Sequence, residues 1–378
     1  MAEWIECKIS DIGTVVGGAT PSTKKPENYE NGTIAWITPK DLSTFTGRYI
    51  QRGERNITEI GLKSCSTQLL PKDTVLFSSR APIGYVAIAA NKVCTNQGFK
   101  SVVPNENTDP LFLYYLLKYN KDKIEGMGSG TTFKEVSGNT MKNIVVSVPT
   151  DKKVQERISS MLGSIDDKIE ENERINNNLE QQISALYQSW FEDFDTTNSI
   201  CPENWNHQEL STIADISSGK RPPMKSESYS QETSIPIVGA ASVMGFTSEA
   251  NHTDKILVTG RVGTHGVVQR FNTPCWTSDN TLVIKSPHYE FTNQILQRID
   301  YSSMNRGSTQ PLITQGDMKK VRVLIPDAET LAKFESFAGT LMKQWEANKQ
   351  ENVKLASLRD TLLPKLMSSE LDVSDIDL

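Results

Sequence analysis

Two long stretches of the chain place apolar residues at alternating steps of four and three, the a/d pattern of a coiled coil. In the first stretch these positions are Ile158, Leu162, Ile165, Ile169, Asn172, Asn176, Leu179, Ile183, Leu186 and Trp190. In the second stretch they are Phe334, Ala338, Leu341, Trp345, Asn348, Asn352, Leu355, Arg359, Leu362 and Leu366. The pattern predicts two long helices, over 151–196 and 327–368, each a rod of about 60 Å.

Both seams carry asparagine at two central positions. The second seam repeats the first at a spacing of 176 residues, so that Asn172 and Asn176 correspond to Asn348 and Asn352. Asparagine buried in a seam lowers stability but fixes the register of the helices. If the helices pack antiparallel, the two asparagine layers meet at mid-length. The alternative is that each helix packs on its own domain and leaves the asparagines exposed.

A globular segment precedes each predicted helix. Short β-rich runs, such as 74–77, 143–148 and 321–325, lie between clusters of Gly, Pro, Ser and Asn in residues 1–150 and 197–326. Residues 111–118 are typical of a buried helix, and 292–299 is the expected equivalent. The predicted fold class is α+β: two homologous mixed α/β domains, separated by two long antiparallel helices, with an acidic tail over 369–378. The sequence does not give the order of the strands.

The two globular segments repeat each other's landmarks. Trp4, Ile9, Ser10, Ile12, Gly18 and Pro21 recur 201 positions later as Trp205, Leu210, Ser211, Ile213, Gly219 and Pro222. Gly130-Thr131-Thr132, Met141-Lys142 and Pro149 recur 177 positions later as Gly307-Ser308-Thr309, Met318-Lys319 and Pro326. A period this long indicates a duplicated domain with its connector rather than a solenoid. The second copy is the shorter one. A chain with such a duplication can fold with pseudo-twofold symmetry. Two related but divergent domains suggest one partner that has two similar, non-identical sites.

The composition is that of an ordinary soluble globular protein, with 37% hydrophobic and 23% charged residues. The sequence has no long apolar run and no signal peptide, and its five cysteines are scattered without a CxxC pair, so we expect a reduced cytoplasmic protein without a zinc site. The net charge is −6, but residues 152–194 and the residues after Lys365 each carry −4, which leaves the globular segments mildly basic. A basic face for nucleic acid is therefore compatible with the charge, although the charge alone does not demonstrate one.

Catalytic signatures are missing from the sequence. It contains no phosphate-binding Gly-rich loop, no HExxH, no Gly-x-Ser-x-Gly elbow and no Asp/Asn-Pro-Pro-Tyr/Phe motif of base methylases. The four histidines are dispersed without metal-ligand spacing. The adjacent acids Asp166-Asp167 and Glu170-Glu171 are expected on a solvated outer helix face rather than as a general acid/base pair. The sequence therefore predicts a binding protein without a catalytic residue or a metal.

An ordered set of motifs carries a family resemblance over essentially the full length. The motifs of the first copy are Thr20-Pro21-Ser22, Ile34-Ala35-Trp36-Ile37, Lys40-Asp41-Leu42, the run 70–76, Ser78-Ser79-Arg80-Ala81-Pro82-Ile83-Gly84, Asn96-Gln97-Gly98-Phe99-Lys100 and Val154-Gln155-Glu156-Arg157-Ile158. Together, ahead of a coiled-coil helix and twice in one chain, they resemble the specificity (S) subunit of type I restriction-modification enzymes. The second copy departs from the pattern, with Thr259-Gly260-Arg261-Val262-Gly263 and Ser278-Asp279-Asn280 at two of the motifs.

The resemblance implies a non-catalytic subunit of a DNA adenine methyltransferase and type I restriction endonuclease complex. Each target-recognition domain would read one half of a bipartite double-stranded DNA site, and the helices would dock two methyltransferase (M) subunits and set the spacer. Motor-nuclease (R) subunits would join for restriction. S-adenosylmethionine, ATP and Mg²⁺ would belong to the partner subunits, with no cofactor in this chain.

Two alternatives remain open on the sequence. One is the specificity subunit of a related bipartite system, such as a type IIB-like enzyme, which differs only in its partners. The other is a coiled-coil scaffold whose globular ends bind proteins, although polar loops rich in Gly, Ser and Arg argue against it. A fused methyltransferase-specificity protein is excluded because no methylase domain is present.

The candidate DNA-binding residues lie in loops of both copies. Arg80 and Arg261 occupy matching places after a strand and could bind guanine or phosphate, or a carboxylate of their own domain. Further candidates for contacts to DNA, many of them equally explained as turn residues or surface charge, are Ser78, Ser79, Lys24, Lys25, Thr131, Thr132, Lys134, Lys220, Arg221, Thr259, Thr264, Arg306, Ser308 and Thr309. Trp36 and Phe99 are expected in the core rather than stacked on bases.

Overall fold

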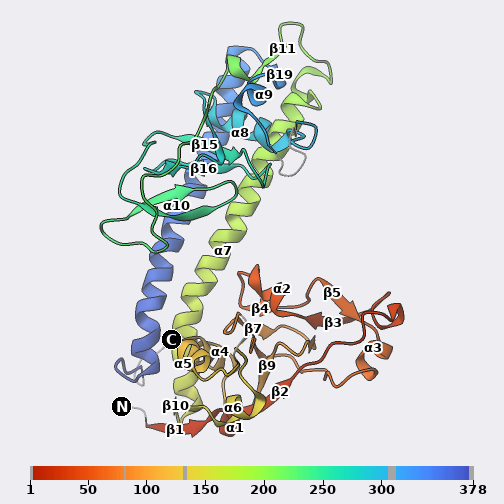
Figure 1. Cartoon of the computed structure of the whole chain (residues 1–378), viewed down its shortest axis with the longest axis vertical. Helices are drawn as coiled ribbons and strands as arrows, with labels where there is room; N and C mark the ends of the chain where they lie inside the picture. The colour runs from red at the N-terminus through yellow and green to blue at the C-terminus, as the bar shows by residue number, and fades with distance from the viewer. Residues whose placement is uncertain (1–2, 81, 131–133, 305–311, 374–378) are drawn as a thin grey trace. The chain divides into compact units, whose positions relative to one another are not determined.

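The structure is a computed structural model of the whole chain, and it describes all residues except 1–2, 81, 131–133, 305–311 and 374–378. It divides into two compact units: Met1–Glu173 with Lys349–Leu378, and Arg174–Asn348. Each unit contains one globular domain and a part of each of two long helices (Figure 1).

The two long helices are α7 (Lys152–Phe191) and α10 (Ala328–Met367). Every predicted seam position lies in one of them and is buried or half-buried. In the first unit Asp166 of α7 contacts Arg359 of α10 and Ile169 contacts Asn352, and in the second unit Asn176 contacts Trp345. Because the residue numbers fall on one helix as they rise on the other, the helices pack antiparallel, which confirms the prediction.

The asparagine layers form as expected. In the first unit the Asn172 side-chain amide donates to Oδ1 of Asn352 (2.8 Å), and in the second unit the Asn348 amide donates to Oδ1 of Asn176 (2.9 Å). Asn172, Asn176 and Asn348 are at most 4% exposed. Asn172 corresponds to Asn348 in the repeat, and Asn176 corresponds to Asn352. The two contacts are therefore equivalent, with the roles of α7 and α10 exchanged. The alternative of exposed asparagines on independently packed helices is wrong.

The expectation of a solvated acidic face on α7 is wrong at Asp166. Asp166 is 5% exposed, and its carboxylate accepts hydrogen bonds from the Tyr115 hydroxyl (2.6 Å) and from Nη1 of Arg359 (2.7 Å). Asp167 and Glu170 both bind Arg48, whose side chain is almost fully buried. The helical pattern places these acids outside the a/d seam, but the first domain covers that part of the helix.

Among its described residues, the first domain contains three sheets. Their strands are β1 (Trp4–Lys8) with β10 (Val145–Pro149); β2 (Gly13–Gly17), β9 (Lys100–Pro104), β6 (Val75–Phe77), β7 (Val86–Ala89) and β4 (Tyr49–Ile50), in that spatial order; and β5 (Arg55–Ile57), β3 (Ile34–Ile37) and β8 (Cys94–Thr95). Its helices are α1 (Ile9–Ile12), η1 (Pro26–Asn28), α2 (Pro39–Ser43), α3 (Glu59–Lys63), α4 (Pro110–Tyr119), α5 (Lys121–Gly126) and α6 (Gly138–Asn143). The strands predicted at 74–77 and 143–148 are present as β6 and β10, although β10 begins later because Asn143 ends α6.

The second domain repeats this architecture in shorter form. Its strands are β11 (Asn206–Glu209) with β19 (Arg322–Ile325); β12 (Asp215–Ser218), β18 (Thr281–Lys285), β15 (Ile256–Gly260) and β16 (Gln269–Phe271), in that spatial order; and β14 (Val243–Thr247), β13 (Ile235–Val238) and β17 (Trp276–Thr277). Its helices are η3 (Leu210–Thr212), α8 (Tyr289–Arg298) and α9 (Gln315–Lys319), and η2 (Asp195–Thr197) precedes it. The expected helical equivalent of α4 is therefore α8, which starts three residues earlier than expected.

The two copies differ most between two equivalent strands. In the first copy residues 38–74, between β3 and β6, carry α2, β4, β5 and α3. In the second copy residues 239–255, between β13 and β15, carry only β14. The shortening of the second copy therefore lies mainly in this segment, and the sheet that supports the neighbouring loops keeps its register.

Each domain is fixed to a long helix at equivalent positions of the repeat. In the first unit the Ser159 hydroxyl donates to Oδ1 of Asp109, the N-cap of α4 (2.7 Å). In the second unit Glu335, which stands 176 positions after Ser159, accepts the main-chain N–H of Phe291 in the first turn of α8 (2.8 Å). Helices α4 and α8 thus join the core of each domain to α7 and α10, with Phe112 and Phe291 fully buried. Among the described residues, no helix is both long and apolar enough to cross a membrane.

Candidate nucleic-acid interface

In the first domain, the candidate interface starts at the end of β6, where main-chain hydrogen bonds join three loops. The Ser79 N–H donates to the Gly98 carbonyl (2.7 Å), and the Ser79 carbonyl accepts from the Val136 N–H (2.9 Å). Arg80 forms an isolated antiparallel bridge with Glu135. The loop after β6, the loop after β8 and the segment before α6 therefore form one frame.

The two serines of this frame are structural. Ser78 and Ser79 are fully buried. The Ser78 hydroxyl donates to the Pro82 carbonyl (2.9 Å) and accepts the Tyr85 N–H (2.8 Å), while the Ser79 hydroxyl donates to the Gly98 carbonyl (3.2 Å). Their hydroxyls shape the loop and are not presented to a phosphate in this structure, which agrees with the alternative explanation of turn residues.

Arg80 lies at the surface of the frame with 47% of its side chain exposed. Its Nε pairs with Glu135 (3.0 Å), and Nζ of Lys100 pairs with the other oxygen of the same carboxylate (3.3 Å). Burial raises the pKa of Glu135, but hydrogen bonds from Arg80 and Lys100 outweigh burial and lower the pKa of this carboxyl below its usual value. Arg80 is thus both bound to a carboxylate of its own domain and accessible to a ligand.

The remaining candidates of the first domain are exposed or lie outside the described residues. Lys24, Lys25 and Lys134 are exposed, whereas Thr131 and Thr132 lie outside the described residues. Trp36 and Phe99 are buried in the core, as predicted, and the Trp36 indole N–H donates to the Ala19 carbonyl (3.2 Å).

The second domain has the same loop frame, but its register corrects the pairing of the two arginines. The Arg261 N–H donates to the Asn280 carbonyl (2.8 Å), and the Arg261 carbonyl accepts from the Ile313 N–H (3.0 Å). These are the hydrogen bonds that Ser79 makes in the first copy. Arg261 is therefore the counterpart of Ser79, and Val262, which forms a bridge with Leu312, is the counterpart of Arg80. The expectation that Arg80 and Arg261 occupy matching places is wrong by one residue.

The surroundings of Arg261 differ from those of Arg80. Its Nε is buried and has no hydrogen-bond partner among the described residues, and Leu312 takes the place of the acid Glu135. Thr264 is exposed in the following loop, whereas Thr259 is buried in β15. Lys220 and Arg221 are exposed beside Gly219, and Arg306, Ser308 and Thr309 lie outside the described residues.

The sequence pattern did not single out Glu135 and Lys100. Glu135 directly follows Gly130-Thr131-Thr132-Phe133-Lys134, and Lys100 is the last residue of the motif Asn96-Gln97-Gly98-Phe99-Lys100, but neither was named as a candidate for DNA binding. The main-chain hydrogen bonds of the frame bring Glu135 and Lys100 to Arg80, and the sequence pattern does not indicate these hydrogen bonds. Within the described part of the chain, no group of three or more His, Cys, Asp or Glu side chains is arranged to hold a metal ion.

Comparisons with known proteins agree with this architecture. The family model described as the type I restriction modification DNA specificity domain matches residues 1–181 and 202–355. The type I restriction enzyme MjaIX specificity subunit of Methanocaldococcus jannaschii is 34% identical over 99% of this chain and 95% of its own length. The type I restriction enzyme HindI specificity subunit of Haemophilus influenzae is 19% identical over 98% of this chain and all of its own length.

A solved structure shows the same fold. The S subunit of a type I restriction-modification system from M. genitalium superimposes with a TM-score of 0.61 at 19% identity, over 99% of this chain and 97% of that one. Both repeats of the chain match the family model, and a relative matches over nearly the full length of both proteins. The chain therefore belongs to the family of type I restriction-modification specificity subunits, and it is a non-catalytic subunit.

Proposed function

We propose that this chain selects the DNA sequence on which a type I restriction-modification complex acts. Residues 1–150 and 197–326 are its target-recognition domains, and each reads one half of a bipartite double-stranded site. The observation that carries this proposal is a repeated main-chain frame with different side chains. Arg80, Glu135 and Lys100 of the first copy are replaced by Val262, Leu312 and Leu282 of the second. The same main-chain support with different side chains suits two half-sites of different sequence.

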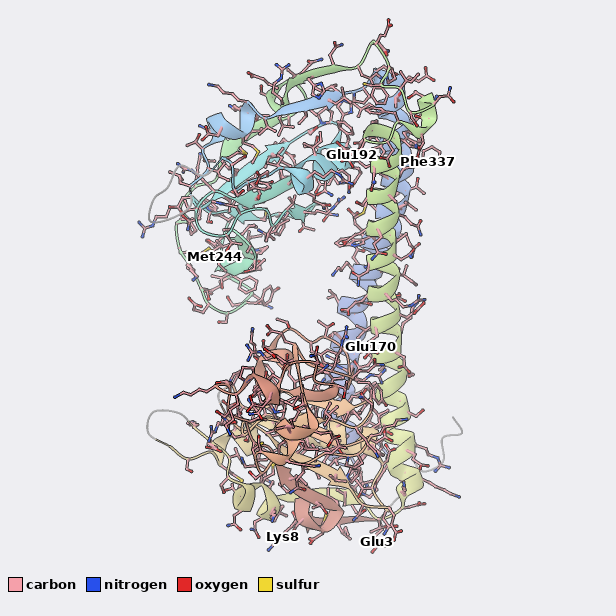
Figure 2. All side chains as sticks on the ribbon, turned by 90° about the vertical axis from the view of Figure 1, so that its right-hand side faces the viewer. Glu3, Lys8, Glu170, Glu192, Met244 and Phe337 are labelled. Atoms are coloured by element: carbon pink, nitrogen blue, oxygen red, sulfur yellow. The ribbon has the colours of Figure 1, made fainter. Side chains whose placement is uncertain are left out.

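The long helices over 151–196 and 327–368 are proposed to dock two M subunits and to set the spacer. Each unit leaves large apolar side chains of α10 exposed, Phe337 in the second unit and Val353 and Leu358 in the first, with exposed fractions between 49% and 71% (Phe337 is labelled in Figure 2). These side chains offer apolar area that a partner subunit could cover. Motor-nuclease subunits would join the assembly for restriction, and the partners would carry S-adenosylmethionine, ATP and Mg²⁺.

Methylome sequencing tests the specificity. A host that carries this chain with its M subunit should show adenine methylation at one bipartite motif, with an unread spacer between two half-sites. The same host without this chain should show none at that motif. Methylation at a continuous motif, or methylation that persists without the chain, would contradict the proposal. A type IIB-like system would show the same motif, but the purified complex would cut DNA beside its site without ATP.

Native mass spectrometry tests the docking. Because α7 and α10 are equivalent in the repeat, we expect two M subunits for each copy of this chain at saturation. A single M subunit at saturation would contradict the proposed equivalence of the two faces. The chain alone should self-associate because its apolar docking residues are exposed.

A further inference from the structure

Three charged side chains meet at the centre of the candidate interface of the first domain. Glu135 lies between Arg80 and Lys100, with contacts of 3.0 and 3.3 Å. The exposure of the side chains falls from 47% for Arg80 to 34% for Glu135 and 15% for Lys100. Lys100 also reaches the buried Ser79 hydroxyl at 3.5 Å, so its ammonium group is fixed from two sides.

A carboxylate in this position opposes binding to any DNA phosphate. Each phosphate that Lys or Arg neutralises releases condensed counterions, and this gain is the same for every DNA sequence. Glu135 is paired with Arg80, which is the more exposed of the two cations in the cluster. A phosphate must therefore compete with this carboxylate for the charge of Arg80, whose Nε is already paired.

The second copy shows that the loop frame does not need these charges. Val262 and Leu312 form the same main-chain bridge as Arg80 and Glu135, and Leu282 stands in the place of Lys100. The hydrogen bonds of the frame come from the main chain of Arg261, Asn280 and Ile313. A purely structural role for the Glu135 cluster is therefore not required by the fold.

We propose that Glu135 determines specificity in the first recognition domain by holding Arg80 back from DNA phosphates. On unrelated DNA Arg80 stays paired with Glu135. The domain then lacks a contact between Arg80 and a phosphate, which would form with any DNA sequence. On the correct half-site Arg80 leaves Glu135 for the O6 and N7 atoms of a guanine, two acceptors that match its two-pronged guanidinium. Lys100 stays with Glu135 and compensates its charge after Arg80 has moved. This inference rests on the proposed function, because it assumes that the frame meets DNA.

The test is Glu135→Gln in the complete complex with M subunits. Binding is measured across several salt concentrations to the duplex identified by the methylome, and to two duplexes in which one or the other half-site is scrambled. The variant should bind the duplex with its own half-site scrambled about three- to tenfold more tightly, with a salt slope steeper by about 1, because one more cation meets phosphate. Binding to the correct duplex should change less, so discrimination at this half-site falls. Discrimination at the other half-site should not change.

Two further variants make the result decisive. Glu54→Gln removes the same charge from an exposed ion pair of the same domain, Lys40–Glu54 (2.8 Å), and should leave discrimination unchanged. Glu135→Leu introduces the residue that the second copy carries at the equivalent position, and it should act as Glu135→Gln does even if the amide variant folds poorly.

Three outcomes would overturn the proposal. Unchanged discrimination in both Glu135 variants would show that Arg80 is not restrained. An equal gain in Glu54→Gln would indicate only the loss of a negative charge. Weaker binding to the correct duplex alone would make Glu135 itself a base contact. If the unaltered complex does not prefer the methylome duplex, the proposed function fails and this inference fails with it, whereas failure of the Glu135 variants alone leaves the function intact.

Discussion

At the scale of single residues, Asp166 joins three helices of the first unit. Its buried carboxylate accepts from Tyr115 of α4 and from Arg359 of α10. Removing one member of a buried ion pair costs about 3 kcal/mol of stability, and Arg359 would then keep only the exposed Asp360 as a partner. Asp166→Asn should therefore lower the stability of the first unit by about that amount, seen as faster hydrogen exchange of the buried amides of α4. Asp360→Asn is the matched control, because Asp360 also binds Arg359 but is 64% exposed. An equal loss in both variants would assign Asp166 no special role.

Arg80 and Arg261 are predicted to act on separate half-sites. If each makes a bidentate contact to a base, Arg80→Ala should weaken binding by about 1 to 3 kcal/mol, and scrambling one half-site should abolish that effect. Arg261→Ala should depend in the same way on the other half-site. Binding measured on the two scrambled duplexes checks this. Equal losses on specific and random DNA would mean that both arginines only bind phosphates.

At the scale of elements, both long helices start after an aspartate at the same position of the repeat. Asp151 accepts the N–H of Lys153, and Asp327 accepts the N–H groups of Glu329 and Thr330. Hydrogen bonds from the main chain and side chain of Thr330, and from the Trp205 indole, outweigh burial and lower the pKa of Asp327 to about 2. The ionised cap therefore stabilises the start of α10.

The lowered pKa gives a pH dependence with a defined sign. A carboxyl whose pKa is lower in the folded state stabilises the fold above its unfolded pKa, and this contribution is lost as the pH falls from about 4 to about 2. Asp327→Asn keeps an acceptable cap but cannot titrate. The unfolding midpoints of the two proteins should therefore differ above pH 4 and converge near pH 2. A constant difference over this range would exclude the titration of Asp327 as the cause.

At the scale of the whole molecule, each recognition domain shares its core with both helices. In the second unit Ile183 and Tyr187 of α7 join Phe334 and Met342 of α10 in one hydrophobic core. One heptad inserted before Leu179 and one inserted before Asn348 should therefore keep both the seam and this core. Each adds about 10 Å of helix, or up to about three base pairs of spacer at 3.4 Å each.

A methylome of the double-insertion variant checks the spacer. The half-site sequences should stay as they were while the spacer lengthens, provided that the added rotation still lets both domains meet the duplex. The single insertion before Leu179 is the control, and it should impair binding because it shifts only one of the two helices that form the core of the second unit. Altered half-site bases with an unaltered spacer would contradict the role of the helices.

The sequence predicted the parts of the fold that follow from local periodicity. The seam and the asparagine layers were correct because a 4-3 pattern repeated at one spacing identifies both the helices and their contact. The buried position of Asp166 was missed because its partners, Tyr115 and Arg359, are distant in the chain. The one-residue shift between Arg80 and Arg261 was missed because loop residues have no periodicity, and only main-chain hydrogen bonds define their register.

The unequal segment between β3 and β6, and between β13 and β15, has a consequence for how such chains can diversify. Residues 38–74 in one copy and 239–255 in the other begin and end on strands whose pairing is preserved. An insertion or deletion in the gene at this point therefore changes the surface beside the loop frame while the flanking strands keep their neighbours, as long as the first copy still supplies the edge strand β4 and Arg48, which binds α7. Exchange of this segment between related genes is a route to altered recognition in a single step, with the rest of the protein inherited unchanged.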